Sequence, residues 1–419
     1  MVTYNVTLTA DGYPSVNLGS MLNQLNLSSG SSDGIEQPNP SNLSVTFLGS
    51  PSLNGTTYPA SWWLGKAITV RIQPSDTTDY ILWNGYVSNA SIEALTPDGS
   101  SLLVSIGAYS DMQILQQQTI NLDGSGGLNL SARIAAVNSA ASALLWSEMD
   151  GTTNWGSIPA SYTWSNIDTI RPSLSVTYLS AVPSPLSSTL PFYYAGTTDA
   201  LSYFQLLATS CNSWFYESAK NGYGLFWQKW RSSGSPAGTT LDISTVGLSQ
   251  SLRADIDVSR LSNEITFTPY DPSLAPFPTT VGDIASIQQY GYRPQSYEIE
   301  NYVYTDMANN ILYRYSQPYT SLSTVDIVVD LLPAASKVDF MFAGPNNRYA
   351  FTNVPTAFGG NDEYEVRGVN LTLQYETAVA SVTVVPSKFW AQYTAWWRVT
   401  STSTWTTYAT ASTKWQDII

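Results

Sequence analysis

Alternation of apolar and polar residues with a period of two is the feature that most limits how this chain can fold. Successive side chains of a strand point to opposite faces, so the alternation is typical of strands with one buried and one exposed face. In the first third of the chain, turn signals such as residues 96–99 (TPDG) separate the alternating segments. We expect a small antiparallel sandwich or barrel here, with strands at 41–48, 67–72, 80–87 and 101–106 and an exposed loop at 28–40.

The pattern returns in the last part of the chain, after a different middle region. Strands are expected at 263–268, 296–304, 324–331, 338–342, 364–375 and 378–385. Helical spacing of apolar residues occurs at 131–149, and again from a cap at Thr198 or Asp199 to Cys211. The predicted fold class is mainly β with a small α+β insert. The predicted domains are 1–115 (β), 116–250 (inserted α+β), 251–398 (β) and 399–419 (an arm rich in Trp and Thr).

The composition excludes several kinds of chemistry. The chain has no His and one Cys, Cys211, so Ser-His-Asp and Cys-His catalysis, His-ligated metals and an internal disulfide are all excluded. Its 17 basic and 31 acidic residues give a net charge of −14, which is unsuited to gripping nucleic acid through phosphates. Only 11% of residues are charged, against about 25% in an ordinary soluble protein, so the polar surface must consist of Ser, Thr, Asn, Gln and Tyr.

Carboxylates are the remaining candidates for catalysis or metal binding, and their spacing favours a structural interpretation. Glu298 and Glu300 share one face of an expected strand, and a second acidic group, Asp362, Glu363 and Glu365, follows two glycines. A solvated strand face explains both groups better than a glycosidase pair does. Calcium binding by Asp76 and Asp79, or by Asn361, Asp362 and Glu363, lacks the spacing of an EF-hand loop. We therefore expect no enzyme activity, no metal site and no cofactor.

Nucleotide and membrane signals are also missing from the sequence. No phosphate-binding loop motif occurs, and residues 124–127 (GSGG) favour a plain loop over an anion site. No apolar run approaches the roughly 20 residues that a membrane helix needs. The first eight residues (MVTYNVTL) lack the basic and apolar regions of a signal peptide, so we expect none.

Tryptophan and tyrosine are abundant, and part of this aromatic content is expected at interfaces. Aromatic rings with one polar end suit subunit contacts, sugar stacking or the core. Neighbouring Trp residues on a strand would point to opposite faces, so one of each pair would leave the core. The candidate interface aromatics are Trp62, Trp63, Trp396, Trp397, Trp405 and Trp415.

Three segments in the second half of the chain carry a resemblance to a known family. Residues 257–268 read DVSRLSNEITFT, residues 283–293 read DIASIQQYGYR, and residues 308–318 read ANNILYRYSQP. In this order they resemble the minor tail or baseplate (tail tip) hub proteins of long-tailed bacteriophages, which are similar to the contractile-tail hub family. The helix at 198–217 and the segment AWWRVT at 395–400 resemble further parts of that pattern. The residues that carry the resemblance are Arg260, Asn263, Glu264, Gly291, Arg293, Arg314 and Pro318.

The resemblance implies a structural virion protein of the phage tail tip, made in the host cytoplasm. Such hubs have two tail-tube-like antiparallel β-barrel domains per chain and smaller inserted domains, so that a homotrimer presents six tube-like domains to a hexameric tail tube. The implied partners are a distal tail protein or tube ring, the tape measure protein and other tail-tip or receptor-binding proteins. DNA would pass non-specifically through the central exit channel during genome ejection, and carboxylates lining that channel would repel its phosphates.

Two other functions stay open at this stage. A neighbouring tail-tip component, the distal tail ring, would be hexameric rather than trimeric. A carbohydrate-binding or glycan-degrading receptor protein would use the Trp and Tyr surface, with Glu298 or Glu363 as candidate catalytic groups.

Overall fold

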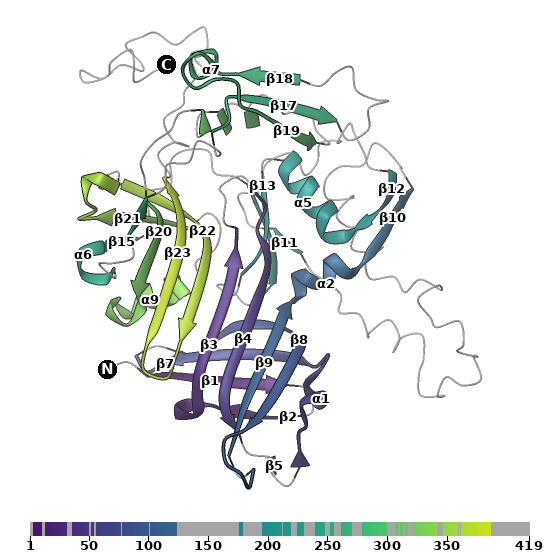
Figure 1. Ribbon diagram of the computed structural model, residues 1–419, viewed down its shortest axis with the longest axis vertical. Helices are drawn as coiled ribbons and strands as arrows, with labels where there is room; N and C mark the ends of the chain where they lie inside the picture. The colour runs from purple at the N-terminus through teal and green to yellow at the C-terminus, as the bar shows by residue number, and fades with distance from the viewer. Residues whose placement is uncertain are drawn as a thin grey trace.

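The computed structural model gives the chain a mainly antiparallel β architecture (Figure 1). This confirms the predicted mainly β fold class. The structure describes residues 3–10, 13–31, 36–49, 52–53, 56–76, 78–99, 101–123, 176–178, 195–211, 213–218, 224–229, 239–247, 252–254, 261–269, 279–299, 307–308, 311–312, 315–316, 322–341, 347–358, 360 and 362–386. The expected helix at 131–149 and the arm at 399–419 lie outside the described residues.

The N-terminal block consists of antiparallel strands joined by short turns. Several of these strands bury alternate residues, as in β1, where Tyr4, Val6 and Leu8 are buried. The described parts of 28–40 are not the exposed loop that was expected, since residues 28–30 belong to β3, residues 39–40 begin β4 and Pro38 is buried. The strands are β1 (Tyr4–Ala10), β2 (Tyr13–Asn17), β3 (Leu22–Gly30), β4 (Asn39–Gly49), β7 (Ala67–Pro74), β8 (Tyr80–Ala94) and β9 (Leu102–Ser110).

Short elements decorate this block. The four-residue helix α1 (Ala60–Trp63) precedes β7, and α2 (Asp111–Gln117) follows β9 directly. Two very short strands, β5 (Ser52–Leu53) and β6 (Thr56–Thr57), pair with each other. The 3₁₀ turn η1 (Gly19–Met21) leads into β3.

The C-terminal block is a second set of mostly antiparallel strands. The expected strand at 338–342 is wrong, because residues 338–341 belong to helix α9, which buries Lys337, Phe340 and Met341 at the i, i+3, i+4 spacing of a helix. The elements of the block are β15 (Thr239–Asp242), α6 (Ile243–Val246), β16 (Arg253–Ala254), β20 (Leu322–Val328), η6 (Val329–Leu331), α9 (Ala334–Met341), β21 (Arg348–Thr352), η7 (Thr356–Phe358), β22 (Asp362–Leu373) and β23 (Ala378–Pro386).

The two blocks form one 13-stranded sheet, because β3 of the first block pairs antiparallel with β22 of the second. The strand order is β16-β20-β23-β22-β3-β4-β9-β8-β7-β1-β2, with β21 on β22 and β15 on β21. At the start of the β3–β22 pairing, Gly30 has φ +93°, and a Cβ placed on it would lie 2.2 Å from the Arg367 carbonyl oxygen. Only glycine permits this approach of the two backbones.

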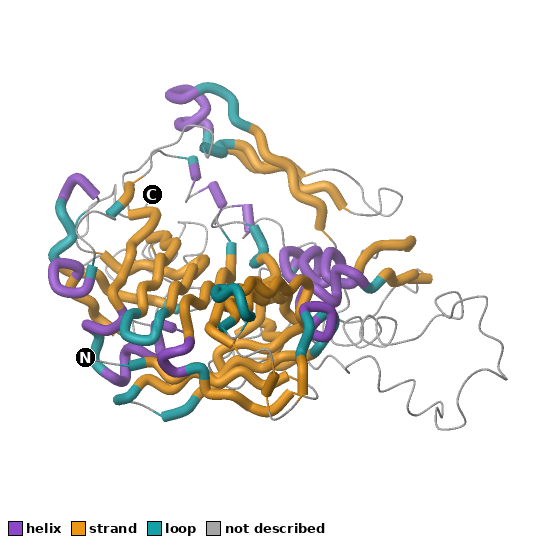
Figure 2. The backbone as a smooth tube through the Cα atoms, turned by 60° about the horizontal axis from the view of Figure 1, so that its bottom comes forward, coloured by secondary structure: helices purple, strands orange, loops and turns teal. Residues whose placement is uncertain are grey.

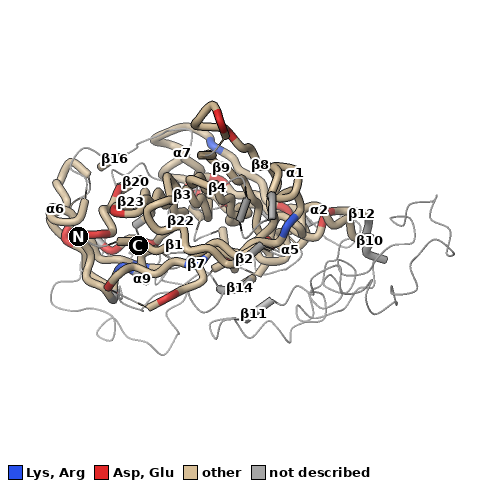
Figure 3. The backbone as a smooth tube through the Cα atoms, turned by 90° about the horizontal axis from the view of Figure 1, so that it is seen from below, with Lys and Arg blue, Asp and Glu red and all other residues tan. Residues whose placement is uncertain are grey.

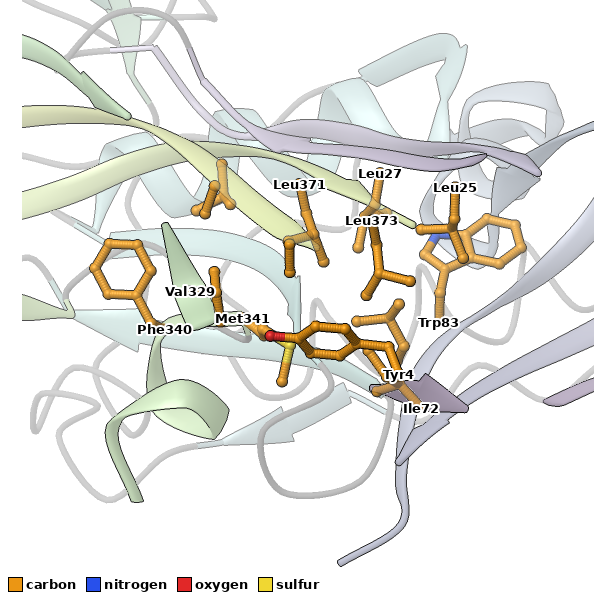
Figure 4. Close-up of a cluster of buried hydrophobic side chains, with 14 of the residues drawn as sticks. Tyr4, Leu25, Leu27, Ile72, Trp83, Val329, Phe340, Met341, Leu371 and Leu373 are labelled. Atoms are coloured by element: carbon orange, nitrogen blue, oxygen red, sulfur yellow. The ribbon is translucent and has the colours of Figure 1, made fainter. Parts of the chain in front are cut away.

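The sheet curls over one hydrophobic core that both blocks share. Figure 4 shows Tyr4 and Ile72 of β1 and β7 facing Leu371 and Leu373 of β22 across this core. The β1–β7 layer and the β3–β22 layer therefore lie on opposite sides of the core, and their outer faces point in opposite directions.

Polar contacts close the curl at its N-terminal end. The Tyr4 amide donates to the Tyr375 carbonyl over 2.8 Å, and the Tyr4 hydroxyl donates to Asp330 of η6. The buried Lys337 ammonium of α9 lies 2.5 Å from Asp76, which follows β7. Burial and the Asp330 contact raise the pKa of the Tyr4 phenol, so the hydroxyl stays protonated and acts as a donor.

A smaller α+β module follows the first block. Its helix α5 (Ala200–Ser210) begins at Asp199, whose carboxylate accepts a hydrogen bond from the Ser202 amide over 2.8 Å, as expected from the capping pattern. The two faces of β13 (Ser213–Ser218) belong to two hydrophobic cores. Phe215 packs with α5, whereas Trp214 and Tyr216 pack with β17 and β19. The other strands are β10 (Thr119–Asp123), β11 (Val176–Tyr178), β12 (Ala195–Asp199) and β14 (Gly224–Lys229).

A three-stranded sheet with one helix lies at one end of the molecule, away from the β1–β7 layer (Figure 1). It consists of β17 (Glu264–Pro269), β18 (Thr279–Gly282), α7 (Ile284–Tyr290) and β19 (Pro294–Ile299). Figure 2 shows this unit projecting from the strands of the large sheet. No helix among the described residues is long and apolar enough to cross a membrane. The domain limits at 115, 250 and 398 stay a prediction.

Replacing Gly30 with Ala tests the close approach of β3 and β22. We expect Gly30→Ala to lower the free energy of unfolding by about 2–5 kcal/mol, because the new Cβ meets both an unfavourable φ and the Arg367 carbonyl. Gly99→Ala is the matched control: its φ is +68°, but nothing lies within 4 Å of the new Cβ, so a loss of about 1–2 kcal/mol is expected. Urea unfolding followed by Trp fluorescence measures the loss in each variant. Equal losses in the two variants would contradict the close approach of β3 and β22 at Gly30.

Candidate functional site

A band of uncharged polar side chains crosses the outer face of the large sheet from one block to the other. Cross-strand pairing aligns Thr372 of β22 with Asn26 of β3, Asn26 with Ser44 of β4, and Ser44 with Gly107 of β9. Three such rows lie side by side. We call them the polar band: Asn370, Ser28 and Asn42; Thr372, Asn26, Ser44, Gly107 and Asn89; and Gln24, Thr46, Ser105 and Ser91.

The polar band satisfies part of its own hydrogen-bonding capacity. The Thr372 hydroxyl donates to the Asn26 side-chain oxygen over 3.1 Å, and the Gln24 amide donates to the same oxygen over 2.9 Å. The Thr46 and Ser105 hydroxyls are 3.2 Å apart across β4 and β9. Groups that bond to one another offer fewer free donors and acceptors to a visiting molecule.

A shallow groove of about 440 Å³ lies along the polar band. Residues on five neighbouring strands line it, and none of them is charged. The apolar lining residues Leu27, Leu43, Ala108 and Leu371 are buried in the core beneath, so the accessible side chains of the groove carry hydroxyls and amides. The groove can therefore form hydrogen bonds but no ion pairs.

Charges stand at the margins of the polar band. Asp326 of β20 extends the first row beyond Ser381 of β23, and Glu93 is exposed at the far end of β8. Figure 3 shows β3, β4 and β9 in tan, without charged residues along their described lengths. The expected concentration of carboxylates toward one surface is not found on this face.

A buried charged cluster ends the polar band at the β13 side. Glu365 and Arg367 of β22 are 2% and 1% exposed, and their nearest charged atoms are 3.3 Å apart. The guanidinium of Arg367 lies 4.4 Å from the ring centre of Trp214 on β13, a cation–π contact. Glu365, a member of the acidic group considered for catalysis, thus has Arg367 as a charged neighbour.

The residues of the family resemblance meet around one buried amide. The side chain of Asn263 is fully buried; it donates to the Gly291 carbonyl over 2.7 Å and accepts from the Arg293 amide over 2.8 Å. Gly291 ends α7 with φ +77°, a conformation that favours glycine. Glu264, the next residue on β17, accepts a hydrogen bond from the Tyr292 hydroxyl.

Serine and aspartate complete this network. Asp283 caps α7 by accepting from the Ser286 amide over 3.1 Å, and it accepts from the Ser316 hydroxyl over 2.7 Å. The Ser286 hydroxyl donates to the Ser316 carbonyl. The network fixes β17, α7 and β19 relative to one another, which is a structural arrangement. Arg260, Arg314 and Pro318 lie outside the described residues.

Of the candidate interface aromatics, Trp62 and Trp63 are described, and they do not lie on a strand as assumed. Both belong to helix α1, where Trp63 is buried in the main core and Trp62 packs partly buried against it. The Tyr58 ring lies 4.7 Å from Trp62, and the Lys66 ammonium lies 5.0 Å from the Trp62 ring centre. The remaining candidates, Trp396, Trp397, Trp405 and Trp415, lie outside the described residues.

Of the other acidic candidates, Asp76 and Asp79 are paired with cations. Glu298 is exposed on β19, whereas Glu300 is not among the described residues. Asp76 contacts Lys337, and Asp79 contacts Arg71 at 2.6 Å. Among the described residues, no group of three or more acidic or sulfur ligands is placed to hold a metal ion.

Comparison with solved structures identifies the fold. The 43 kDa tail protein of prophage MuSo2 from Shewanella oneidensis matches at a TM-score of 0.56 and 10% identity, over 93% of this chain and 98% of that one. A tail protein from Neisseria meningitidis matches at 0.56 and 12% identity, with the same coverage. No family model and no curated protein sequence matches this chain. The chain has the fold of phage and prophage tail proteins, as the sequence resemblance implied.

Replacing Asn263 tests the buried amide network. We expect Asn263→Ala to speed hydrogen exchange of the α7 and β19 amides about tenfold to a hundredfold, because the Arg293 amide and the Gly291 carbonyl lose buried partners. Thr266→Ala removes only the exposed contact with Thr280 and is the control, with less than about a threefold change expected. Equal exchange in both variants would contradict the role of Asn263.

Asp111 provides a pH-dependent test beside the groove. It starts α2 next to Tyr86 of β8, and burial raises the pKa of its carboxyl group above the ordinary 3.8. The folded chain then holds a proton that the unfolded chain has lost, so stability falls as pH rises from the unfolded pKa through the raised folded pKa.

We therefore expect Asp111→Asn to be more stable than the parent protein at pH 7, with the difference disappearing as pH falls to about 3. Urea unfolding of both proteins at pH 7 and at about pH 3 measures this difference in the free energy of unfolding. Glu93→Gln removes one exposed negative charge and is the control. A parent protein that gains stability relative to Asp111→Asn as pH rises would show that the carboxylate is instead stabilised by its surroundings.

Proposed function

We propose that the protein is a structural component of a phage tail tip, a baseplate hub that joins the tail tube to the host-contacting tip. The observation that supports this best is the joining of two antiparallel β blocks of one chain through β3 and β22 into a single wall. The shared fold with prophage tail proteins supports the same class of function.

We further propose that three chains form a closed ring. Each chain contributes two β blocks, so a trimer contributes six, which matches the symmetry of a hexameric tube. The ring would surround the exit channel for the genome, and its neighbours would be a distal tail protein or tube ring, the tape measure protein and receptor-binding proteins. The role is non-enzymatic, and the network around Asn263 serves structure in this proposal.

Symmetry is the direct test of this function. Averaged images of the purified full chain and of the tail tip should show a threefold ring with a central channel, and the purified ring should have three times the mass of one chain. A sixfold ring would instead assign the chain to the distal tail ring. A strictly monomeric protein in solution and in the particle would contradict both assignments.

A further inference from the structure

The polar band extends across both β blocks, so it belongs to the joined wall and to neither block alone. Asn370 and Thr372 come from the C-terminal block, whereas Asn26, Ser28, Asn42 and Ser44 come from the N-terminal block. A surface that is continuous across the junction can act only when the blocks are joined.

The polar band lacks the features of a protein–protein interface. Stable interfaces have an apolar, aromatic-rich centre, and the groove presents hydroxyls and amides that already bond to one another. The large apolar side chains that are exposed in the described part of the chain, such as Ile284 at 71% and Leu331 at 59%, do not line the groove.

The polar band also lacks the positive charges that would hold DNA. Adhesion of DNA to a protein depends on Lys and Arg displacing counterions from the phosphates. The groove has no cation to do so, although Asn and Ser positions could hold Lys at little steric cost on an open surface. Asp326, at the end of the first row, and Glu93, exposed near the end of β8, are acidic and lie at the margins. A phosphate backbone that contacts this surface therefore meets neither attraction nor close repulsion.

We propose that the polar band faces the passing DNA and that it prevents adhesion by being neutral, in place of the carboxylate lining expected from the sequence. This inference rests on the proposed hub function. Weak, exchangeable hydrogen bonds to water and phosphate allow sliding, since no site along the rows binds a phosphate more tightly than the next.

The test introduces cations on the polar band and on the opposite side of the molecule. Asn26→Lys with Asn370→Lys places two cations in the groove. Asn5→Lys with Thr69→Lys is the matched control, because both residues alternate with buried neighbours on β1 and β7 and therefore lie on the outer face across the core. Asn26→Asp with Asn370→Asp tests repulsion at the same positions. Each full-length variant is built into phage particles, and the rate of triggered DNA release is measured at about 50 and 200 mM salt.

Neutrality predicts that the groove Lys variant releases DNA at least about fivefold more slowly than the parent at low salt, with most of the loss recovered at high salt. The control Lys variant and the Asp variant should release DNA at the parental rate. Parental release by the groove Lys variant, or equal slowing by both Lys variants, would overturn the assignment of this face. Much faster release by the Asp variant would overturn neutrality as the mechanism.

A second measurement separates charge from folding. Cys211 is the only cysteine of the chain and is buried, so a cysteine introduced as Asn26→Cys can be labelled selectively in the folded protein. Attachment of a cationic thiol reagent should slow release in reassembled particles, whereas a neutral reagent of similar size should not. Equal effects of both reagents would overturn the proposal. Particles whose parental chain forms no threefold ring would instead contradict the hub function itself.

Discussion

The pairing of β3 with β22 is the contact on which the rest of the structure depends. It connects segments about 340 positions apart and turns two strand sets into one sheet. The approach is close enough that Gly30 and Gly368 both face backbone of the partner strand, with no room for a side chain. Hydrogen bonds between strands and a shared apolar core then stabilise the junction together.

The smaller module is attached to this wall through the segment before β4. The Gln37 side chain donates to the Ser213 carbonyl over 2.9 Å and accepts from the Phe215 amide over 3.1 Å, which holds β13 against the first block. On the other block, Arg367 lies against Trp214 of the same strand. β13 therefore contacts both sides of the β3–β22 junction. Its Trp214 and Tyr216 side chains also pack in the hydrophobic core of β17 and β19, so β13 links the junction to the unit around Asn263.

Local features of the structure could be predicted from the sequence because they depend on neighbouring residues. The alternation located long strands such as β4, β8, β22 and β23, although not β1, β2 or β3, and the Asp199 cap located α5. The strand expected at 338–342 is wrong because a segment of five residues (VDFMF) fits a helical period as well as an alternating one. Trp62 and Trp63 were expected on a strand, although Pro59, the residue directly before α1, suits a helix start. The pairing of β3 with β22 has no local signal, since either strand could pair with many others.

The polar band was also missed, although the sequence contained a signal for it. Within the polar band, the outward positions of β3, β4 and β9 are Asn, Ser, Thr, Gln and Gly without a single charge, in strands whose exposed face would ordinarily carry Lys or Glu. The low charge of the whole chain, 11% of residues, does not by itself indicate which face is uncharged. Several carboxylates of the described residues cap helices, as those of Asp199 and Asp283 do, or close the curl, as that of Asp330 does.

Hydrogen exchange of β3 tests the central claim, that the two blocks form one continuous sheet, most directly. As an interior strand between β4 and β22, β3 should exchange only with the most slowly exchanging strands, at a rate comparable to that of β4. The edge strand β2 should exchange far faster. Exchange of β3 at the rate of β2, with β4 still protected, would show that the junction opens independently and would contradict the account.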